Sequence, residues 1–105
     1  MRGIKILDSL YRSGPTFQCQ WKLGEKQVLR EALKPLGRDA IYYKAGFFAA
    51  STVPRAFHGL PRWFQPHIDA QALKYVVVEM SGEVVEEVPG VFVCSEMTIV
   101  SEIVV

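Results

Sequence analysis

The sequence has few cysteines and no long apolar run, and these two shortages exclude several classes of protein. Two cysteines in 105 residues are too few for a disulfide-dense miniature domain or a four-cysteine zinc site. No apolar stretch approaches the roughly 20 residues of a membrane-spanning helix. The opening MRGIKILDSLYRSG also lacks the apolar segment of a signal peptide. The sequence therefore predicts a single cytoplasmic domain over residues 1–105, with reduced, unpaired thiols and no membrane partner.

The residue spacings that mark common catalytic and metal sites are missing as well. The two histidines, His58 and His67, are nine residues apart, and both cysteines lie far from them in sequence, so no metal-binding spacing exists. The eight glycines are dispersed, so there is no phosphate-binding loop, and no serine lies in a G-x-S-x-G elbow. We therefore expect no metal, no cofactor and no catalytic residue.

Charge is unevenly distributed, although the chain carries a net charge of only +1. Residues 1–67 have a net charge of +7 and residues 68–105 a net charge of −6. Such a split indicates either a basic face for nucleic acid or two halves whose charges pair across one fold. The positive charges are scattered and form no run of like charge, which favours pairing.

Apolar periodicity predicts more strand than helix. Strands are expected over residues 3–8, 16–21, 40–44, 74–80, 83–88 and 91–105, with a second apolar piece at 46–50. A helix is expected over 26–36, fraying before Pro35, and a short one after Ser51 or Thr52, with Pro54 in its first turn. Residues 61–70 are expected to form an ordered loop. The fold class is therefore α+β: a mostly antiparallel sheet of five or six strands, with two short helices on one face.

The last third of the chain has the clearest pattern. Pro89-Gly90 between two apolar strands is the pairing that a type II turn requires, and Ser81-Gly82 predicts a turn or bulge. Residues 91–105 alternate along one long strand, with a kink expected near Ser95. On this pattern one face is buried, and it carries Val93, Met97, Ile99 and Ile103.

Cations and aromatics are interleaved between residues 55 and 67, the stretch with the weakest secondary-structure signal. The candidate binding residues are Arg55, His58, Arg62, Trp63 and His67, with Tyr43 upstream. Arginine and tryptophan are enriched at protein interfaces, and binding groups often lie on loops. The same residues could stack nucleic-acid bases across region 42–67, or the aromatics could simply fill the core.

Five short phrases resemble a family of small uncharacterised domains common in bacteriophages and prophages. They are GIK at 3–5, FQCQWKLGEK at 17–26, GFFAA at 46–50, VEMSGEV at 78–84 and IVSE at 99–102. The third phrase departs from the family's G-F-H-x-C, because Phe48 and Ala50 replace the histidine and the cysteine. The resemblance implies a phage or prophage origin, a bacterial host cytoplasm and a small α+β fold, but no activity.

These observations together favour a non-catalytic accessory protein that acts by binding another protein. Inhibition of a host defence system is one specific form of that function. A nucleic-acid-binding module using region 42–67 is the alternative. A small transferase-like enzyme, built from residues that only the fold brings together, is the third hypothesis. The sequence leaves the oligomeric state open.

Overall fold

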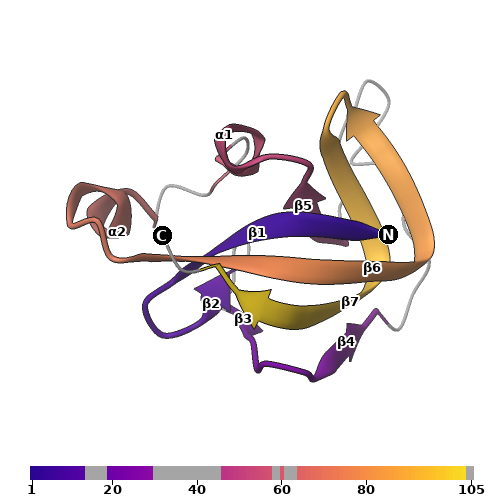
Figure 1. Ribbon diagram of the computed structural model, residues 1–105, viewed down its shortest axis with the longest axis horizontal. Coiled ribbons are helices and arrows are strands. Elements are labelled where there is room, and N and C mark those ends of the chain that lie inside the picture. The colour runs from indigo at the N-terminus through magenta and orange to yellow at the C-terminus, as the bar shows by residue number, and fades with distance from the viewer. Residues whose placement is uncertain (14–18, 30–45, 58–59, 61–63, 104–105) are drawn as a thin grey trace.

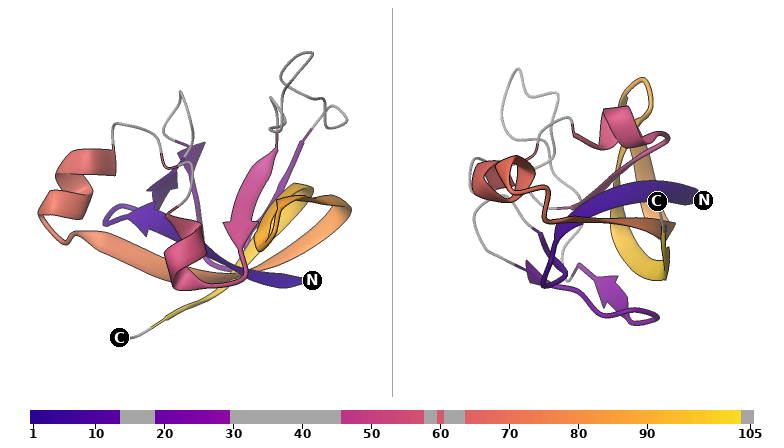
Figure 2. Two further views of the ribbon diagram at one scale, coloured as in Figure 1. Left: turned by 90° about the horizontal axis from the view of Figure 1, so that it is seen from above. Right: turned by 60° about the vertical axis from the view of Figure 1, so that its left-hand side comes forward.

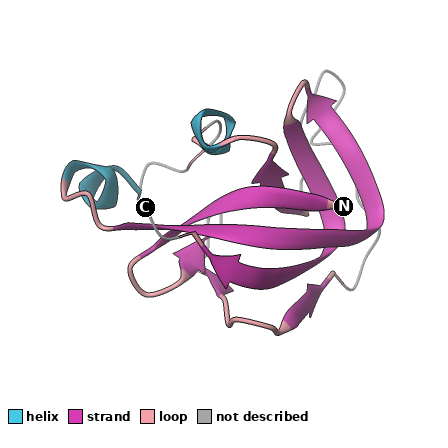
Figure 3. Ribbon diagram, viewed as in Figure 1, coloured by secondary structure: helices cyan, strands magenta, loops and turns pink. Residues whose placement is uncertain are grey.

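A computed structural model describes residues 1–13, 19–29, 46–57, 60 and 64–103 of the chain (Figure 1). The main sheet comprises β1 (Arg2–Asp8), β4 (Lys26–Val28), β5 (Phe47–Ala50), β6 (Leu73–Val88) and β7 (Val91–Glu102). A separate pair is formed by β2 (Arg12–Ser13) and β3 (Cys19–Gln20), and the helices are α1 (Val53–Ala56) and α2 (Gln65–Asp69) (Figure 3). The α+β class is thus confirmed, with five strands in the main sheet.

The main sheet is antiparallel and closes on itself. Its strand order is β4-β7-β5-β1-β6, and β7 pairs along its other edge with β6. The pairings β1–β6, β6–β7, β7–β5 and β5–β1 therefore form a closed circuit, with β4 added beside β7. Figure 2 shows the β6–β7 hairpin curving around this circuit. Closure leaves few free strand edges.

The β6–β7 hairpin forms as the sequence predicts. Pro89 and Gly90 connect the strands, and Gly90 has a φ of 80°, which a type II turn requires at its third position. A β-bulge lies between Ser81 and Val84, where Gly82 has a φ of 70° and the Ser95 hydroxyl accepts a 2.9 Å hydrogen bond from the Glu83 N–H. A Cβ on Gly82 would overlap the Ser95 side chain, so this bend requires glycine.

The core lies inside the closed sheet. Its buried residues are Leu7, Trp21, Ala49, Val76, Val78, Met80, Cys94, Met97 and Ile99. Strand β1 alternates, so Leu7 faces this core while Ile6 and Asp8 face the other side. Helix α1 packs against β1 and β5, and Phe64, just before α2, is fully buried. Val93, Met97 and Ile99 of β7 are fully buried as expected, whereas Ile103, just after the end of β7, is only half-buried.

Two expectations along the chain are wrong. Residues 26–28 are a strand rather than the start of a helix, because they pair with Glu96, Met97 and Thr98 of β7. The rest of that predicted helix, from residue 30, lies outside the described residues. Residues 65–69 form α2 rather than a loop, since Pro66 lies in the first turn of a helix, where its missing N–H costs nothing.

The remaining expectations hold where the structure describes them. Thr52 caps α1 by accepting a 3.3 Å hydrogen bond from the Arg55 N–H. The predicted strands 74–80 and 83–88 are one continuous strand, β6. Only the end of the predicted strand 16–21 is described, as β3, and 40–44 lies outside the described residues. That both helices share one face stays a prediction.

Several ion pairs join the basic and acidic parts of the chain. The amino group of Met1 and the guanidinium of Arg2 lie 3.1 and 3.5 Å from the Glu79 carboxylate. Lys26 of β4 lies 3.3 Å from Glu96 of β7. These contacts match the expectation that the two halves of the chain neutralise each other across the sheet.

Candidate binding surface

The structure describes two of the six residues that the sequence predicts for binding. Arg55 is exposed on α1, beside the turn at Gly90, and His67 is half-buried on α2. In Figures 1 and 2 these two helices lie apart along β1. Tyr43, His58, Arg62 and Trp63 lie outside the described residues.

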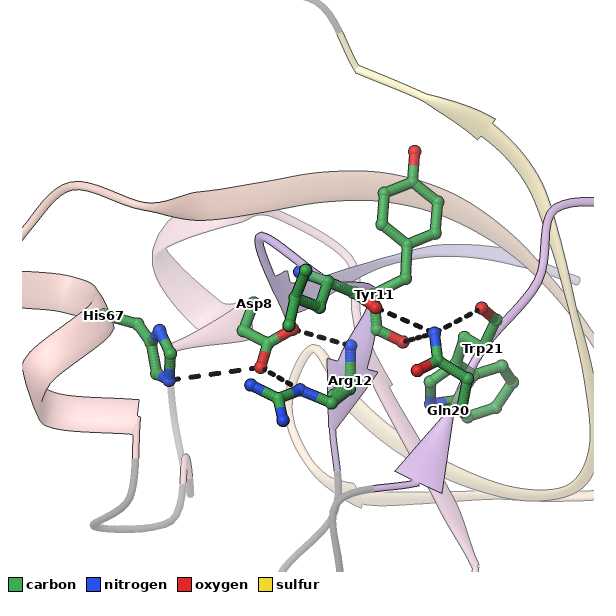
Figure 4. A network of polar contacts seen from close by, with 7 residues as sticks. Asp8, Tyr11, Arg12, Gln20, Trp21 and His67 are labelled. Carbon is green, nitrogen blue, oxygen red and sulfur yellow. Dashed lines mark hydrogen bonds and ion pairs between the residues drawn. The ribbon is translucent and has the colours of Figure 1, made fainter.

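Asp8, at the end of β1, is the centre of the polar network in Figure 4, and its side chain is fully buried. Its Oδ1 accepts hydrogen bonds from the Leu10 N–H at 2.9 Å and the Arg12 N–H at 2.8 Å. Its Oδ2 accepts from Arg12 Nε at 2.8 Å. Between Leu10 and Arg12, the backbone of Tyr11 has a φ of 59°, in the left-handed region. The Asp8 carboxylate therefore holds the tight turn between β1 and β2.

His67 approaches the same carboxylate from α2. Its Nε2 lies 4.0 Å from Asp8 Oδ2, which is too long for a hydrogen bond, so the contact is an ion pair only when the imidazole is protonated. The sequence singled out His67 but missed Asp8 and Arg12. An aspartate two residues before an N–H that it accepts is an Asx turn, a pattern readable in principle at Asp8-Ser9-Leu10.

A second network joins the β1–β2 turn to the ends of β6 and β7. The Tyr11 hydroxyl donates to Glu102 Oε2 at 3.0 Å, and Lys74 Nζ lies 3.1 Å from Glu102 Oε1. The hydrogen bonds from Lys74 and Tyr11 lower the pKa of the Glu102 carboxyl. Partial burial, together with the neighbouring Glu102, raises the pKa of Tyr11. The turn is thus held from both sides, as a rigid structural element.

The Lys5 ammonium and the Cys94 thiol are two polar groups that lie against the core. Lys5 Nζ donates to the Phe48 carbonyl at 2.7 Å and lies 5.3 Å from the centre of the Trp21 ring, a cation–π contact. The Cys94 thiol donates to the Glu96 carbonyl at 3.1 Å and forms no disulfide. Burial raises the pKa of Cys94 to about 11, partly opposed by the charge of Lys5. Cys94 is therefore a structural thiol that stays protonated at neutral pH.

The raised pKa of Cys94 predicts a loss of stability in alkali. The thiol ionises near pH 9 in the unfolded chain and near 11 in the folded one, so its contribution is complete below pH 9. Between these values the free energy of unfolding should fall by about 1.4 kcal/mol per pH unit more than in Cys94→Ala. Urea unfolding of both proteins from pH 8 to 11 measures the difference. Equal slopes would show that Cys94 ionises in the folded state as it does in the unfolded state.

A third place, which we call the β4 edge, carries the exposed apolar side chains of Leu23 and Val28, with Lys26 between them in sequence and Val100 of β7 beside them. Leu23 is 60% exposed, Val28 57% and Val100 36%. Leu23 bridges to Ile99, and Val28 pairs with Glu96. These residues therefore all lie beside the same part of β7. The sequence analysis misses this surface, because it predicts a break in the chain at Leu23 and places Val28 on the apolar face of a helix.

The described residues contain neither a group of metal ligands nor a membrane-spanning helix. No three His, Cys, Asp or Glu side chains among them are gathered as metal ligands. In the part of the chain that the structure describes, no helix has the length and apolar character to cross a membrane.

Comparisons with protein-family models, curated proteins and solved structures find no match. The resemblance to phage domains therefore stays a prediction.

Proposed function

We propose that this chain is a non-catalytic accessory protein that acts by binding another protein. The observation that carries the proposal is the β4 edge. Two of its apolar side chains, Leu23 and Val28, are more than half exposed. The resemblance to phage and prophage domains makes a protein of the bacterial host the expected partner, and inhibition of a defence enzyme one form of the function.

Exposed apolar residues are common when scattered, but a group of them on a strand edge is characteristic of an interaction site. Lys26 and Val28 lie on the short strand β4, and Val100 adds to them from β7. Leu23 precedes β4 in the sequence and bridges to Ile99. Beneath this surface Met97 and Ile99 are fully buried, which gives it a rigid base. A rigid surface loses little conformational entropy when a partner binds.

Two of the described cations are better suited to a protein partner than to nucleic acid. Arg12 is paired with the buried Asp8, and Lys74 with Glu102. A cation that already has a carboxylate beside it contributes little to a phosphate-binding surface, since the carboxylate repels the phosphate. Arg12 and Lys74 are therefore poorly suited to follow a nucleic-acid backbone.

The matched variants Leu23→Asp and Leu10→Asp test this proposal. Both leucines are 60% exposed, but Leu10 lies on the β1–β2 turn rather than at the β4 edge. We expect the parent and Leu10→Asp to capture the same protein from a nuclease-treated bacterial lysate, and Leu23→Asp to lose it. Circular dichroism of the three proteins serves as the folding control.

Two results would contradict the proposal. Equal capture by all three proteins would show that the β4 edge takes no part in binding. Recovery of nucleic acid in place of a protein, with affinity that falls steeply as salt is raised, would support the nucleic-acid-binding alternative instead.

A further inference from the structure

Residues 22–29, which include β4 and which we call the strap, lie along the edge of β7 and bury no side chain. Six of the eight residues are exposed, and the other two, Gln27 and Leu29, are only half-buried. The residue just before the strap, Trp21, is 2% exposed and belongs to the core. Burial of apolar side chains is the main force that holds an element in a fold. The strap therefore lacks the contribution that fixes the other strands of the main sheet.

Backbone hydrogen bonds attach the strap to β7. The Gly24 N–H donates to the Ile99 carbonyl at 2.8 Å. The Leu29 N–H donates to the Ser95 carbonyl at 2.9 Å, and the three-residue pairing of β4 with β7 lies between these two bonds. Each such bond contributes little net free energy at an exposed position, because water replaces the partner when the bond opens. The ion pair of Lys26 with β7 is exposed as well, and solvent weakens it.

The rest of the main sheet is complete without the strap. Strands β1, β6, β7 and β5 form their closed circuit through pairings that do not involve β4. Met97 and Ile99 of β7 belong to the core, and they pair with Met80 and Val78 of β6 along the other edge of β7. Release of the strap would therefore leave the core and its strands in place.

We infer that the strap is a detachable element, which opens from β7 by itself while the closed circuit stays folded. Local opening needs less free energy than global unfolding where few apolar contacts are lost. The chain turns at Gly24, which has a φ of 77°, and a glycine changes its backbone conformation at little cost, so this residue can act as the hinge. The open state frees the edge of β7 between Ser95 and Ile99, and the closed state, which carries the β4 edge, predominates. The inference concerns the free protein and does not depend on the proposed function.

Amide hydrogen exchange of the free protein, corrected for intrinsic rates, tests the inference. The Gly24 and Leu29 amides report on the strap. The Val76 and Val78 amides are the reference, since β6 is paired with β1 on one edge and β7 on the other. We expect the strap amides to exchange at least about 100-fold faster than the reference amides. Low concentrations of urea should accelerate exchange of the reference amides alone, because urea sensitivity scales with the surface that an opening exposes.

A reversible lock between β4 and β7 provides the second arm of the test. Lys26 lies opposite Thr98, and the Leu29 bond makes this a non-hydrogen-bonded pair, whose Cα atoms are about 4.5 Å apart, within the range of a disulfide. In the double variant Lys26→Cys with Thr98→Cys, oxidation should slow exchange of the Gly24 and Leu29 amides at least about tenfold, with the reduced form as the matched control. Peptide mapping confirms the engineered bridge.

Two results would overturn the inference. One is that the strap and reference amides of the parent exchange at the same rate and respond equally to urea, which would mean that the strap opens only when the whole chain unfolds. The other is that the oxidised and reduced forms of the double variant give the same exchange at the strap. If the bridge does not form, the urea series on the parent decides by itself.

Discussion

Replacing Ile99 with alanine is expected to lower the free energy of unfolding by about 2–5 kcal/mol, the usual range for truncating a buried isoleucine. Ile99 is fully buried in the main core and pairs with Val78 of β6. The surrounding strands belong to a closed sheet and cannot easily collapse into the space left by the side chain. Urea unfolding of the parent and the variant measures the change.

Val100→Ala is the matched control for that experiment. Val100 follows Ile99 on the same strand but is 36% exposed, so its truncation should cost less than about 0.5 kcal/mol. If Ile99→Ala costs no more than Val100→Ala, the inward and outward faces of β7 are assigned the wrong way round.

Removing the Asp8 carboxylate is the second substitution with a large expected effect. Asp8→Ala should destabilise the fold by about 1–3 kcal/mol or more, because it removes the buried acceptor of the 2.8 Å hydrogen bond from the partly exposed Arg12 guanidinium. The N–H groups of Leu10 and Arg12 lose their acceptor as well. Asp8→Asn keeps a carbonyl oxygen for these N–H groups and removes only the charge, so its effect should be smaller.

Asp69→Ala serves as the control for a solvent-exposed aspartate. Its carboxylate accepts a 2.8 Å hydrogen bond from Gln65 on the surface of α2, and losing that bond should cost under about 1 kcal/mol. Thermal unfolding of the three variants against the parent gives the order Asp8→Ala, Asp8→Asn, Asp69→Ala. Equal melting temperatures for Asp8→Ala and Asp69→Ala would mean that the β1–β2 turn does not depend on Asp8.

The features that the sequence predicts correctly are those set by neighbouring residues. The turn at Pro89-Gly90 follows from the two residues that form it. The inward positions of Val76, Val78 and Met80 follow from simple alternation, and the α1 cap follows from Thr52 and the proline after it. Each of these needs only a few consecutive residues to form.

The features that the sequence misses depend on distant contacts. Residues 26–28 carry apolar spacing typical of a helix, but hydrogen bonds to β7, about 70 residues later, make them a strand. The contact between Asp8 and His67 depends in the same way on the fold, which brings α2 to within 4.0 Å of the Asp8 carboxylate. The β4 edge could not be predicted, since its exposure exists only once β4 has joined the sheet.

Amide hydrogen exchange of the β4 edge, in the free protein and in complex with the captured partner, tests the central claim most directly. The Gln27 amide points toward β7 and should be protected in both states, whereas those of Lys26 and Val28 point outward. We predict that Lys26 and Val28 exchange rapidly in the free protein and become protected in the complex. Protection of those two amides already in the free protein, or no change when the partner binds, would contradict the account.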